Sequence, residues 1–324
     1  MIKIVDQIKW KDSYSVLAKT EYLRSSANVV KYGYFVDDEL VLPFVIKKKS
    51  IFSWMQLVTE IMGADDGDSA DNFLEECIKL GGNIFGISHV VTVNTALFKN
   101  YPQGSVYCKW GSYKVDLSLT EEELFSNLHS KHRNVIRKAE SLGSKVDCGR
   151  EYANDAVALM NDTYNRQAGK HGIDSTFVNR MTKLGKNVDW WVVKDSEGNL
   201  QGSAIFVWST GASCYYMHGG SSAHTSPGAM NYLIWKAMLE MKRRGVKIFD
   251  FVGARLTTEP GSKLEGIQRF KSRFGSTLND GYMFRYVYRP FKYWLYTQAI
   301  KTYAHMHHEH YSDIIMEERK KGNL

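Results

Sequence analysis

Two polar residues stand inside apolar segments in the second half of the sequence. Asp250 interrupts the strand-like run IFDFVG, and a buried carboxylate must be paired or must shift its pKa. Asp250 could orient an acceptor amine or accept its proton; equally, it could cap backbone groups or pair with Arg255 or a basic helix. His218 lies between YYM and GG, where it could act as a general base near neutral pH. The alternative for His218 is a structural hydrogen bond to a loop.

Tyr216 and a group of basic side chains are further candidates for substrate binding. Tyr216 could donate a hydrogen bond in a pocket, or it could simply pack in the core. The basic side chains could hold phosphates, because charge-assisted hydrogen bonds from arginine to a pyrophosphate are strong. The alternative is a solvated helix face. These basic residues are Lys131, Arg133, Arg137 and Lys138.

The histidines and cysteines do not predict a metal site. In HMHHEH, the pairs His305 and His308, and His307 and His310, are three residues apart, yet no tetrahedral ligand set is evident. The four cysteines are scattered without a CxxC pair, which indicates reduced thiols. We therefore expect no metal. No Ser-His-Asp or Cys-His set stands at recognisable spacing.

Alternating helices and strands must position these residues. Thr120 and Glu123 have the spacing of a capping box and Gly143 closes the pattern, which predicts one helix over 120–143. Runs rich in β-branched and aromatic residues predict strands at 29–48, 189–222, 246–253 and 282–290. Further helices are predicted at 7–20, 151–168, 174–185, 229–244, 264–274 and 290–321.

The composition is that of a globular protein with about two domains. The chain has 324 residues, of which 44% are hydrophobic and 24% charged. A formal net charge of +7 suits an anionic partner or, equally, a lysine-rich solvated surface. The first ten residues lack the apolar run of a secretory leader, and no stretch approaches the length of a membrane span. We therefore expect a soluble cytoplasmic protein.

Four segments together resemble the FemABX peptidyltransferase family and the wider GNAT-like acyltransferases. They follow one another within residues 108–280, as SKHRNVIRKAESLG, YYMHGGSS, the helix and strand from Ala229 to Gly253, and GIQRFKSRFGS. The resemblance implies an α/β (α+β) fold with two adjacent GNAT-like domains, each a mixed central sheet flanked by helices. It places the first domain at 1–110, with C-terminal helices 285–324 packing back on it. The second domain, 111–284, carries the motifs.

The resemblance also implies a reaction. Members of the family move an aminoacyl group from aminoacyl-tRNA to an amine of a peptidoglycan precursor, and relatives use other acyl donors and amino-sugar acceptors. We therefore expect an acyl or aminoacyl transferase that forms an amide bond on a cell-wall or surface-polysaccharide precursor. Such a reaction needs a positioned neutral amine, donors for the oxyanion and an exit for a proton.

The same resemblance singles out Phe270 and Lys271. In the family, the lysine of this F-K pair faces the site and steadies negative charge on the donor or the intermediate. The alternative for Lys271 is a surface lysine on an amphipathic helix. The F-K-x-x-F-G element favours catalysis over the alternative of another class, a non-catalytic GNAT-like module that binds a nucleotide sugar or RNA.

The sequence leaves the acyl donor open. Enzymes that use coenzyme A cradle its pyrophosphate in a Q/R-x-x-G-x-G/A turn that opens a helix. The segment AHTSPGAM lacks that full pattern, and Pro227 has no N–H to donate. A tRNA or otherwise non-CoA donor is slightly favoured over acyl-CoA, and no tightly bound cofactor is expected. The alternative is an acyl-CoA-dependent N-acyltransferase acting on a nucleotide- or lipid-linked amino sugar.

The expected partners follow from these two alternatives. The acceptor would be a nucleotide- or lipid-linked envelope precursor, and the donor charged tRNA or acyl-CoA. No DNA partner is expected, because no helix-turn-helix or zinc-finger signature is present. No membrane span is expected either, and a peripheral membrane contact stays open.

Overall fold

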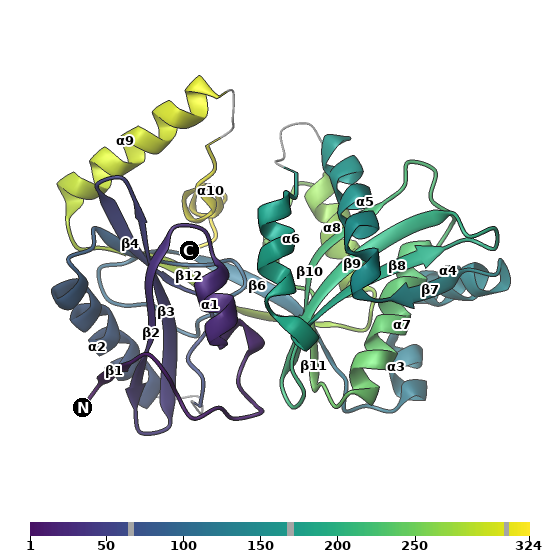
Figure 1. The fold of residues 1–324 in the computed structure, drawn as a ribbon, viewed down its shortest axis with the longest axis horizontal. Helices are drawn as coiled ribbons and strands as arrows, with labels where there is room; N and C mark the ends of the chain where they lie inside the picture. Colours follow the sequence, from purple (N-terminus) through teal and green to yellow (C-terminus); the bar gives the residue numbers. More distant parts are fainter. Residues whose placement is uncertain (64–67, 167–171, 308–310) are drawn as a thin grey trace. The chain divides into compact units, whose positions relative to one another are not determined.

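A computed structural model describes residues 1–63, 68–166, 172–307 and 311–324. These residues divide into two compact units, whose elements are labelled in Figure 1. The first unit comprises residues 1–112, 253–260 and 279–324, and the second comprises 113–252 and 261–278. Within the described residues, no helix is both long and apolar enough to cross a bilayer.

The first unit is a mixed sheet with helices on it. Its strand order is β1-β2-β3-β4-β5-β12-β6, in which β4 and β5 are parallel. Its strands are β1 (Lys3–Val5), β2 (Val29–Asp37), β3 (Leu40–Lys49), β4 (Phe52–Leu57), β5 (His89–Thr92), β6 (Val106–Asp116) and β12 (Thr277–Val287). Its helices are η1 (Val16–Ala18), α1 (Thr20–Ser25), α2 (Asp68–Phe85), α9 (Pro290–Met306) and α10 (Ile314–Lys320).

Hydrophobic packing explains the first unit's main layer. Phe73, Leu74 and Cys77 of α2 bury themselves against Phe44 of β3 and Val90 of β5 in one core cluster. The prediction of one helix over residues 7–20 is wrong. Ser15 caps only the short 3-10 turn η1, and α1 follows it as a separate helix.

The second unit has the strand order β6-β11-β10-β9-β8-β7. Strand β11 is parallel to β10, and the other pairings in this order that the structure records are antiparallel. Its further strands are β7 (Lys145–Cys148), β8 (Val188–Lys194), β9 (Leu200–Trp208), β10 (Ser213–Ser221) and β11 (Ile248–Asp250). Its helices are α3 (Glu121–Asn127), α4 (Ser130–Ser141), η2 (Arg150–Tyr152), α5 (Ala153–Asn165), α6 (Ser175–Thr182), η3 (Gly185–Asn187), α7 (Ala229–Arg243) and α8 (Lys263–Ser272).

Helices lie on both faces of the second unit's sheet. On one face, α4 and α7 bury Ile136 and Leu233 against Phe206 and Phe249. On the other face lies α5, whose Ala156 carbonyl accepts a hydrogen bond from Ser203 of β9. The two faces are called here the α7 face and the α5 face.

The helix predicted over 120–143 is two helices in the structure. The capping box of Thr120 and Glu123 is present, but α3 ends at Asn127 and Leu128 is extended. The side chain of His129 then accepts the N–H of Lys131 and caps α4. The α/β fold class with mixed sheets and flanking helices is confirmed.

Candidate functional site

The candidate site lies where the parallel strands β10 and β11 stop pairing. The two strands pair only over Ser213–Tyr215 and Ile248–Asp250. Strand β11 ends at Asp250, whereas β10 runs on to Ser221 beside β9. Groups placed just past this point can therefore meet a ligand between the strand ends, as is usual for open sheets with parallel strands.

A polar cluster occupies the end of β11. Asp250 is 4% exposed, and its Oδ1 accepts the N–H of Val252 at 2.8 Å while Oδ2 lies 3.7 Å from Nζ of Lys114. Lys271 of α8 is buried, and its Nζ donates to the carbonyl oxygen of Val252. We call Lys114, Asp250, Val252 and Lys271 the Asp250–Lys271 cluster.

An unusual backbone turn presents the Val252 carbonyl to Lys271. Val252 has φ +42° and Gly253 has φ +53°. A β-branched residue in the left-handed region is strained, and such strain persists only where surrounding structure holds it. The Asp250 carboxylate and the Lys271 ammonium bond this turn from two sides, so they fix its shape and each other's position.

Burial sets the proton affinity of Lys271. Desolvation lowers the pKa of Lys271 to about 8, and the charge of Asp250 partly opposes that shift. A buried ammonium of this kind is held in a low-dielectric site, where its attraction for a developing negative charge is strong. Lys271 is therefore a cation near neutral pH that loses its proton in mildly alkaline solution.

His218 forms a second polar group on β10. Its Nδ1 is 2.9 Å from the hydroxyl of Tyr164 on α5, and the ring of Phe177 packs edge-on against it at 5.0 Å. Burial raises the pKa of Tyr164, so the phenol is neutral. When the phenol accepts the Nδ1–H, the lone pair lies on Nε2, which is the tautomer suited to taking up a proton.

The strand register places His218 and Asp250 on one face of the sheet. His218 pairs with Ile205 and Asp250 pairs with Tyr215, both of which alternate with residues of the α7 face. The contact of His218 with Tyr164 of α5 agrees with this assignment. The structure thus brings Asp250 together with Lys271, and it puts His218 on the same α5 face with Tyr164.

The two glycines after His218 have separate roles. A Cβ on Gly219 would lie 1.8 Å from the hydroxyl oxygen of Tyr216, so the absence of a side chain makes room for that phenol. A Cβ on Gly220 would lie 2.6 Å from the backbone of Met160, so this glycine allows α5 to approach β10. Tyr216 itself packs against Phe206 on the α7 face, and burial raises its pKa.

A buried histidine anchors α8 and therefore Lys271. His132 of α4 is 6% exposed, and its Nε2 is 3.1 Å from the carbonyl oxygen of Phe270. Its ring also contacts Phe274 at 4.7 Å. Desolvation lowers the pKa of His132 to about 4, so the imidazole is neutral and donates its Nε2–H to Phe270. Phe270 packs against the core, whereas its neighbour Lys271 bonds the Val252 turn.

The four basic residues of α4 are spread around the helix. Arg133 donates to the carbonyls of Ser126 and Leu128 and so satisfies the C-terminal end of α3. The guanidinium of Arg137 lies over the ring of Phe125 at 5.1 Å. Lys131 and Lys138 are exposed.

The turn that opens α7 is shaped by helix packing. Gly228 has φ +82°, and a Cβ there would lie 2.1 Å from the carbonyl oxygen of Val135 on α4. Helix α4 therefore packs directly against the turn that opens α7.

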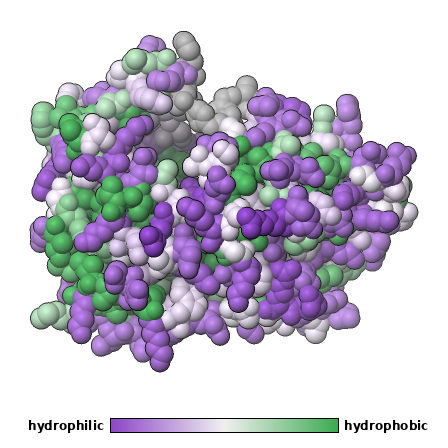
Figure 2. Space-filling model, viewed as in Figure 1, coloured by the Kyte–Doolittle hydropathy of each residue, from purple (hydrophilic) through white to green (hydrophobic). Residues whose placement is uncertain are grey.

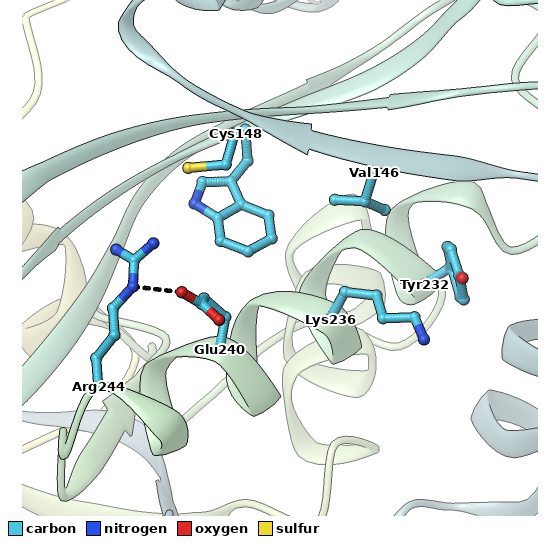
Figure 3. A pocket seen from close by; sticks show the side chains of 7 residues that line it. Val146, Cys148, Tyr232, Lys236, Glu240 and Arg244 are labelled. Carbon is cyan, nitrogen blue, oxygen red and sulfur yellow. Dashed lines mark hydrogen bonds and ion pairs between the residues drawn. The ribbon is translucent and has the colours of Figure 1, made fainter.

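A cavity of about 310 Å³ lies on the α7 face (Figure 3). In Figure 3, Cys148 points toward the end of Arg244, which is bonded to Glu240. Cys148 is an exposed free cysteine. The cavity is lined by Val146, Cys148, Trp191, Tyr232, Lys236, Glu240 and Arg244, on the opposite face from Asp250 and His218.

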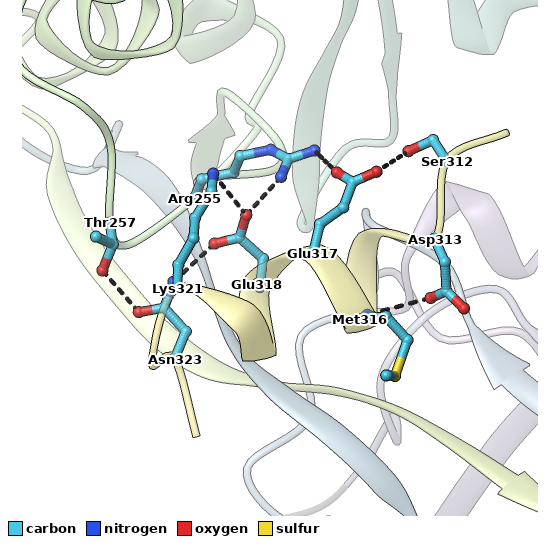
Figure 4. A network of polar contacts seen from close by, with 9 residues as sticks. All are labelled: Arg255, Thr257, Ser312, Asp313, Met316, Glu317, Glu318, Lys321 and Asn323. Atoms are coloured by element: carbon cyan, nitrogen blue, oxygen red, sulfur yellow. Dashed lines mark hydrogen bonds and ion pairs between the residues drawn. The ribbon is translucent and has the colours of Figure 1, made fainter. Parts of the chain in front are cut away.

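Arg255 does not pair with Asp250. Its guanidinium bonds Glu318, which is fully buried, at 2.5 Å and Glu317 at 3.0 Å (Figure 4). Asn323 donates to the same Glu318 carboxylate and accepts from Thr257. This network ties residues 253–260 to α10 within the first unit.

The histidine-rich segment contributes no ligand set among the described residues. The Nδ1–H of His307 donates to the Tyr303 carbonyl oxygen, and the two rings stack. His308, Glu309 and His310 lie outside the described residues. No group of three or more potential ligands is found in the part of the chain that the structure describes.

Sequence reasoning missed Tyr164, Lys114 and His132. Each contacts the site only through the tertiary fold, since Tyr164 and His218 are 54 residues apart and His132 and Phe270 are 138 apart. The one available signal was His132, a single imidazole on the apolar side of an otherwise basic helix.

Comparison with known proteins shows which domain family contains the candidate site and which solved structures share the fold. A family model described as an acetyltransferase (GNAT) domain matches residues 126–272, which include Asp250, Lys271, His218 and His132. No curated protein matches the sequence. The crystal structure of FemX superposes with a TM-score of 0.67 at 13% identity, over 87% of this chain and 94% of that one.

Two further solved structures share the fold. The structure of L-PGS from Bacillus licheniformis gives a TM-score of 0.53 at 14% identity, over 81% of this chain and 86% of that one. The C-terminal domain of a putative lysylphosphatidylglycerol synthetase from Agrobacterium fabrum gives 0.51 at 12% identity, over 78% and 84%. Residues 126–272 thus match a GNAT acetyltransferase domain, which makes the chain an acyltransferase, and its fold is similar to that of FemX.

Proposed function

We propose that this protein transfers an acyl or aminoacyl group to an amine of a cell-wall or surface-polysaccharide precursor and forms an amide bond. The observation that carries the proposal is the buried Lys271 ammonium, held near Asp250 at the end of β11 inside the region that matches a GNAT domain. The FemX-like fold and the likeness to a putative lysylphosphatidylglycerol synthetase support an envelope role.

The proposed reaction needs no covalent enzyme intermediate. The amine nitrogen attacks the carbonyl carbon of an ester or thioester donor, and the carbonyl oxygen becomes an oxyanion. Lys271 stabilises that oxyanion, because its charge is preorganised in a site shielded from water. The carbon–oxygen or carbon–sulfur bond then breaks, the donor's alcohol or thiol leaves with a proton, and the amide remains.

The proton released by the attacking amine needs an acceptor. His218 fits this role, because its Nδ1 contact with Tyr164 orients the ring and its Nε2 can take up the proton. Asp250 fits a positioning role, because its carboxylate holds the Val252 turn and balances the charges of Lys271 and Lys114.

The turn at Gly228 favours a donor other than acyl-CoA. Its left-handed backbone and its contact with Val135 are accounted for by the packing of α4, and Pro227 precedes it. The second candidate, an acyl-CoA-dependent N-acyltransferase acting on a nucleotide- or lipid-linked amino sugar, keeps support from the GNAT domain itself.

An assay with defined donors tests the proposal. The purified protein is incubated with an amine-bearing envelope precursor and either charged tRNA or acyl-CoA, and the amide product is measured by mass spectrometry. We expect product with charged tRNA and its loss after ribonuclease treatment. Product formed with acyl-CoA alone would support the second candidate. No amide with any donor, from protein that melts cooperatively, would refute the proposal.

A further inference from the structure

Helix α9 of the first unit has two apolar faces. Its inner face carries Tyr293, Tyr296 and Ile300, which line a cavity of about 630 Å³ together with strand residues such as His89. The rings of Tyr293 and His89 are 4.8 Å apart. The inner face is therefore packed onto the first unit, and it accounts for only part of the helix's apolar surface.

The outer face of α9 leaves large apolar side chains in solvent. Phe291 is 72% exposed, Trp294 54% and Met306 70%, and Leu295 is also exposed. At 100° per residue, these four side chains fall within an arc of about 120°. Isolated exposed apolar residues are ordinary, but a group on one helix face marks an interaction site.

The turn between β3 and β4 extends the same surface. Ile51 at this turn is 71% exposed. The ring of Phe52 packs against Tyr296 at 5.6 Å, and Nζ of Lys49 lies 4.5 Å from the ring centroid of Tyr303. We call Ile51, Phe291, Trp294, Leu295, Tyr303 and Met306 the α9 surface. At the upper left of Figure 2, where α9 lies, hydrophobic side chains alternate with hydrophilic ones.

The charged side chains of the two segments that form the α9 surface have one sign. Segments 47–52 and 289–306 contain no aspartate or glutamate. Their basic residues are Lys47, Lys48, Lys49, Arg289, Lys292 and Lys301. A second copy of the chain would place like charges against each other, whereas a surface of negative charge would be attracted.

We propose that the α9 surface binds the surface of an anionic lipid membrane. Aromatic rings with lysines beside them are the composition of helices that lie in the membrane interface. Phe291, Trp294 and Leu295 would enter the boundary between headgroups and acyl chains, while the lysines contact lipid phosphates. This inference goes beyond the proposed transfer reaction and does not depend on it.

Vesicle binding tests the inference on the full chain. Sedimentation is measured with phosphatidylcholine vesicles and with vesicles that also contain phosphatidylglycerol. We expect binding only to the anionic vesicles, weaker binding at high salt, and a blue shift of tryptophan emission that is lost in Trp294→Ser. Phe291→Ser with Trp294→Ser should reduce the partition coefficient by about tenfold or more.

Matched variants separate this surface from general effects. Ile84 on α2 is 54% exposed in the same unit, and Ile84→Ser should bind like the wild type. Lys48→Gln with Lys301→Gln should lower binding and weaken its salt dependence. All variants should keep the wild-type melting temperature and the wild-type transfer rate on a soluble amine acceptor.

Three outcomes would overturn the inference. The first is no binding to anionic vesicles. The second is an equal loss of binding in Ile84→Ser. The third is a concentration-dependent dimer, seen by light scattering, that Trp294→Ser dissociates. Because the transfer assay uses a soluble acceptor, failure here is distinguishable from failure of the proposed function.

Discussion

Lys271 holds a positive charge in a place where water is scarce, so its removal is the most direct residue-level test. Lys271→Met keeps the aliphatic stem and deletes the charge. We expect turnover to fall by about 10²–10³, the range seen when one preorganised oxyanion donor is lost. The loss should appear in kcat more than in KM, because the charge acts in the transition state.

The control for this variant is a lysine elsewhere in the second unit. Lys145 on β7 is exposed, and Lys145→Met should leave turnover unchanged. A Lys271→Met protein with a normal melting temperature and more than half of the wild-type turnover would remove Lys271 from the mechanism.

The proton affinity of Lys271 gives a second readout at the same scale. The pKa of Lys271 is about 8, so the ammonium is present below that pH and lost above it. We expect kcat to rise as the acceptor amine becomes neutral and then to fall as pH passes through about 8. In Lys271→Arg, the falling limb should disappear, because a guanidinium does not lose its proton. A falling limb that persists unchanged in the arginine variant would contradict the assignment.

The sequence indicates some residues of the candidate site more readily than it indicates the residues that they contact. Asp250 stands out because a lone carboxylate interrupts an apolar strand, and the structure buries it at the end of β11. Tyr164 and Lys114 do not stand out, because nothing local marks a tyrosine or a lysine that will meet its partner across the sheet. Sequence patterns report burial and periodicity, whereas the contact of Lys114 with Asp250 arises from strand order and that of Tyr164 with His218 from the packing of α5 on β10.

The packing of α4 on α7 at Gly228 gives a prediction at the scale of elements. Gly228→Ala forces a left-handed alanine and a clash with the Val135 carbonyl, so α4 must move. We expect the free energy of unfolding to fall by about 2–4 kcal/mol in urea titration.

Substitution of a second glycine should change the free energy of unfolding in the opposite direction. Gly266 lies inside α8, and a Cβ there meets no atom within 4 Å. Gly266→Ala should raise the free energy of unfolding by about 0.5–1 kcal/mol, because alanine favours the helix. If Gly228→Ala unfolds at the wild-type urea concentration, close packing of α4 and α7 is not what that glycine serves.

Some helix boundaries agree with the predicted ones and others do not, and both outcomes have physical reasons. Helices α5, α7 and α8 lie near their predicted positions, because apolar periodicity and terminal glycines mark them. The apolar stripe did not predict the break between α3 and α4. The stripe continues through Leu128, although the backbone of Leu128 is extended. His129 as an N-cap is the signal that the periodicity concealed.

At the scale of the molecule, buried histidines make both units sensitive to acid. Desolvation lowers the pKa of His132 in the second unit to about 4 and that of His89 in the first unit to about 3. The unfolded chain binds protons at these residues below about pH 6.5. Their stabilisation is therefore complete above pH 6.5 and is lost as pH falls toward the folded-state values.

Urea unfolding at several pH values measures this effect. We expect the free energy of unfolding to fall between pH 6.5 and 5, by on the order of 1–2 kcal/mol for each histidine. His132→Gln should flatten this dependence, whereas His305→Gln on the exposed side of α9 should not. Equal stability of the wild type at pH 7 and pH 5 would contradict the burial of both imidazoles.

The place of β12 in the first unit's sheet has a consequence during synthesis. Strand β12 lies between β5 and β6, and the buried Glu318 that holds Arg255 comes later still. A ribosome has therefore delivered every residue of the second unit, up to Leu278, before the first unit has all of its strands. Domains usually fold in the order in which they emerge, but here the second unit can fold first. Until β12 has emerged, the nascent chain exposes the edges of β5 and β6, and unpaired strand edges of this kind favour aggregation.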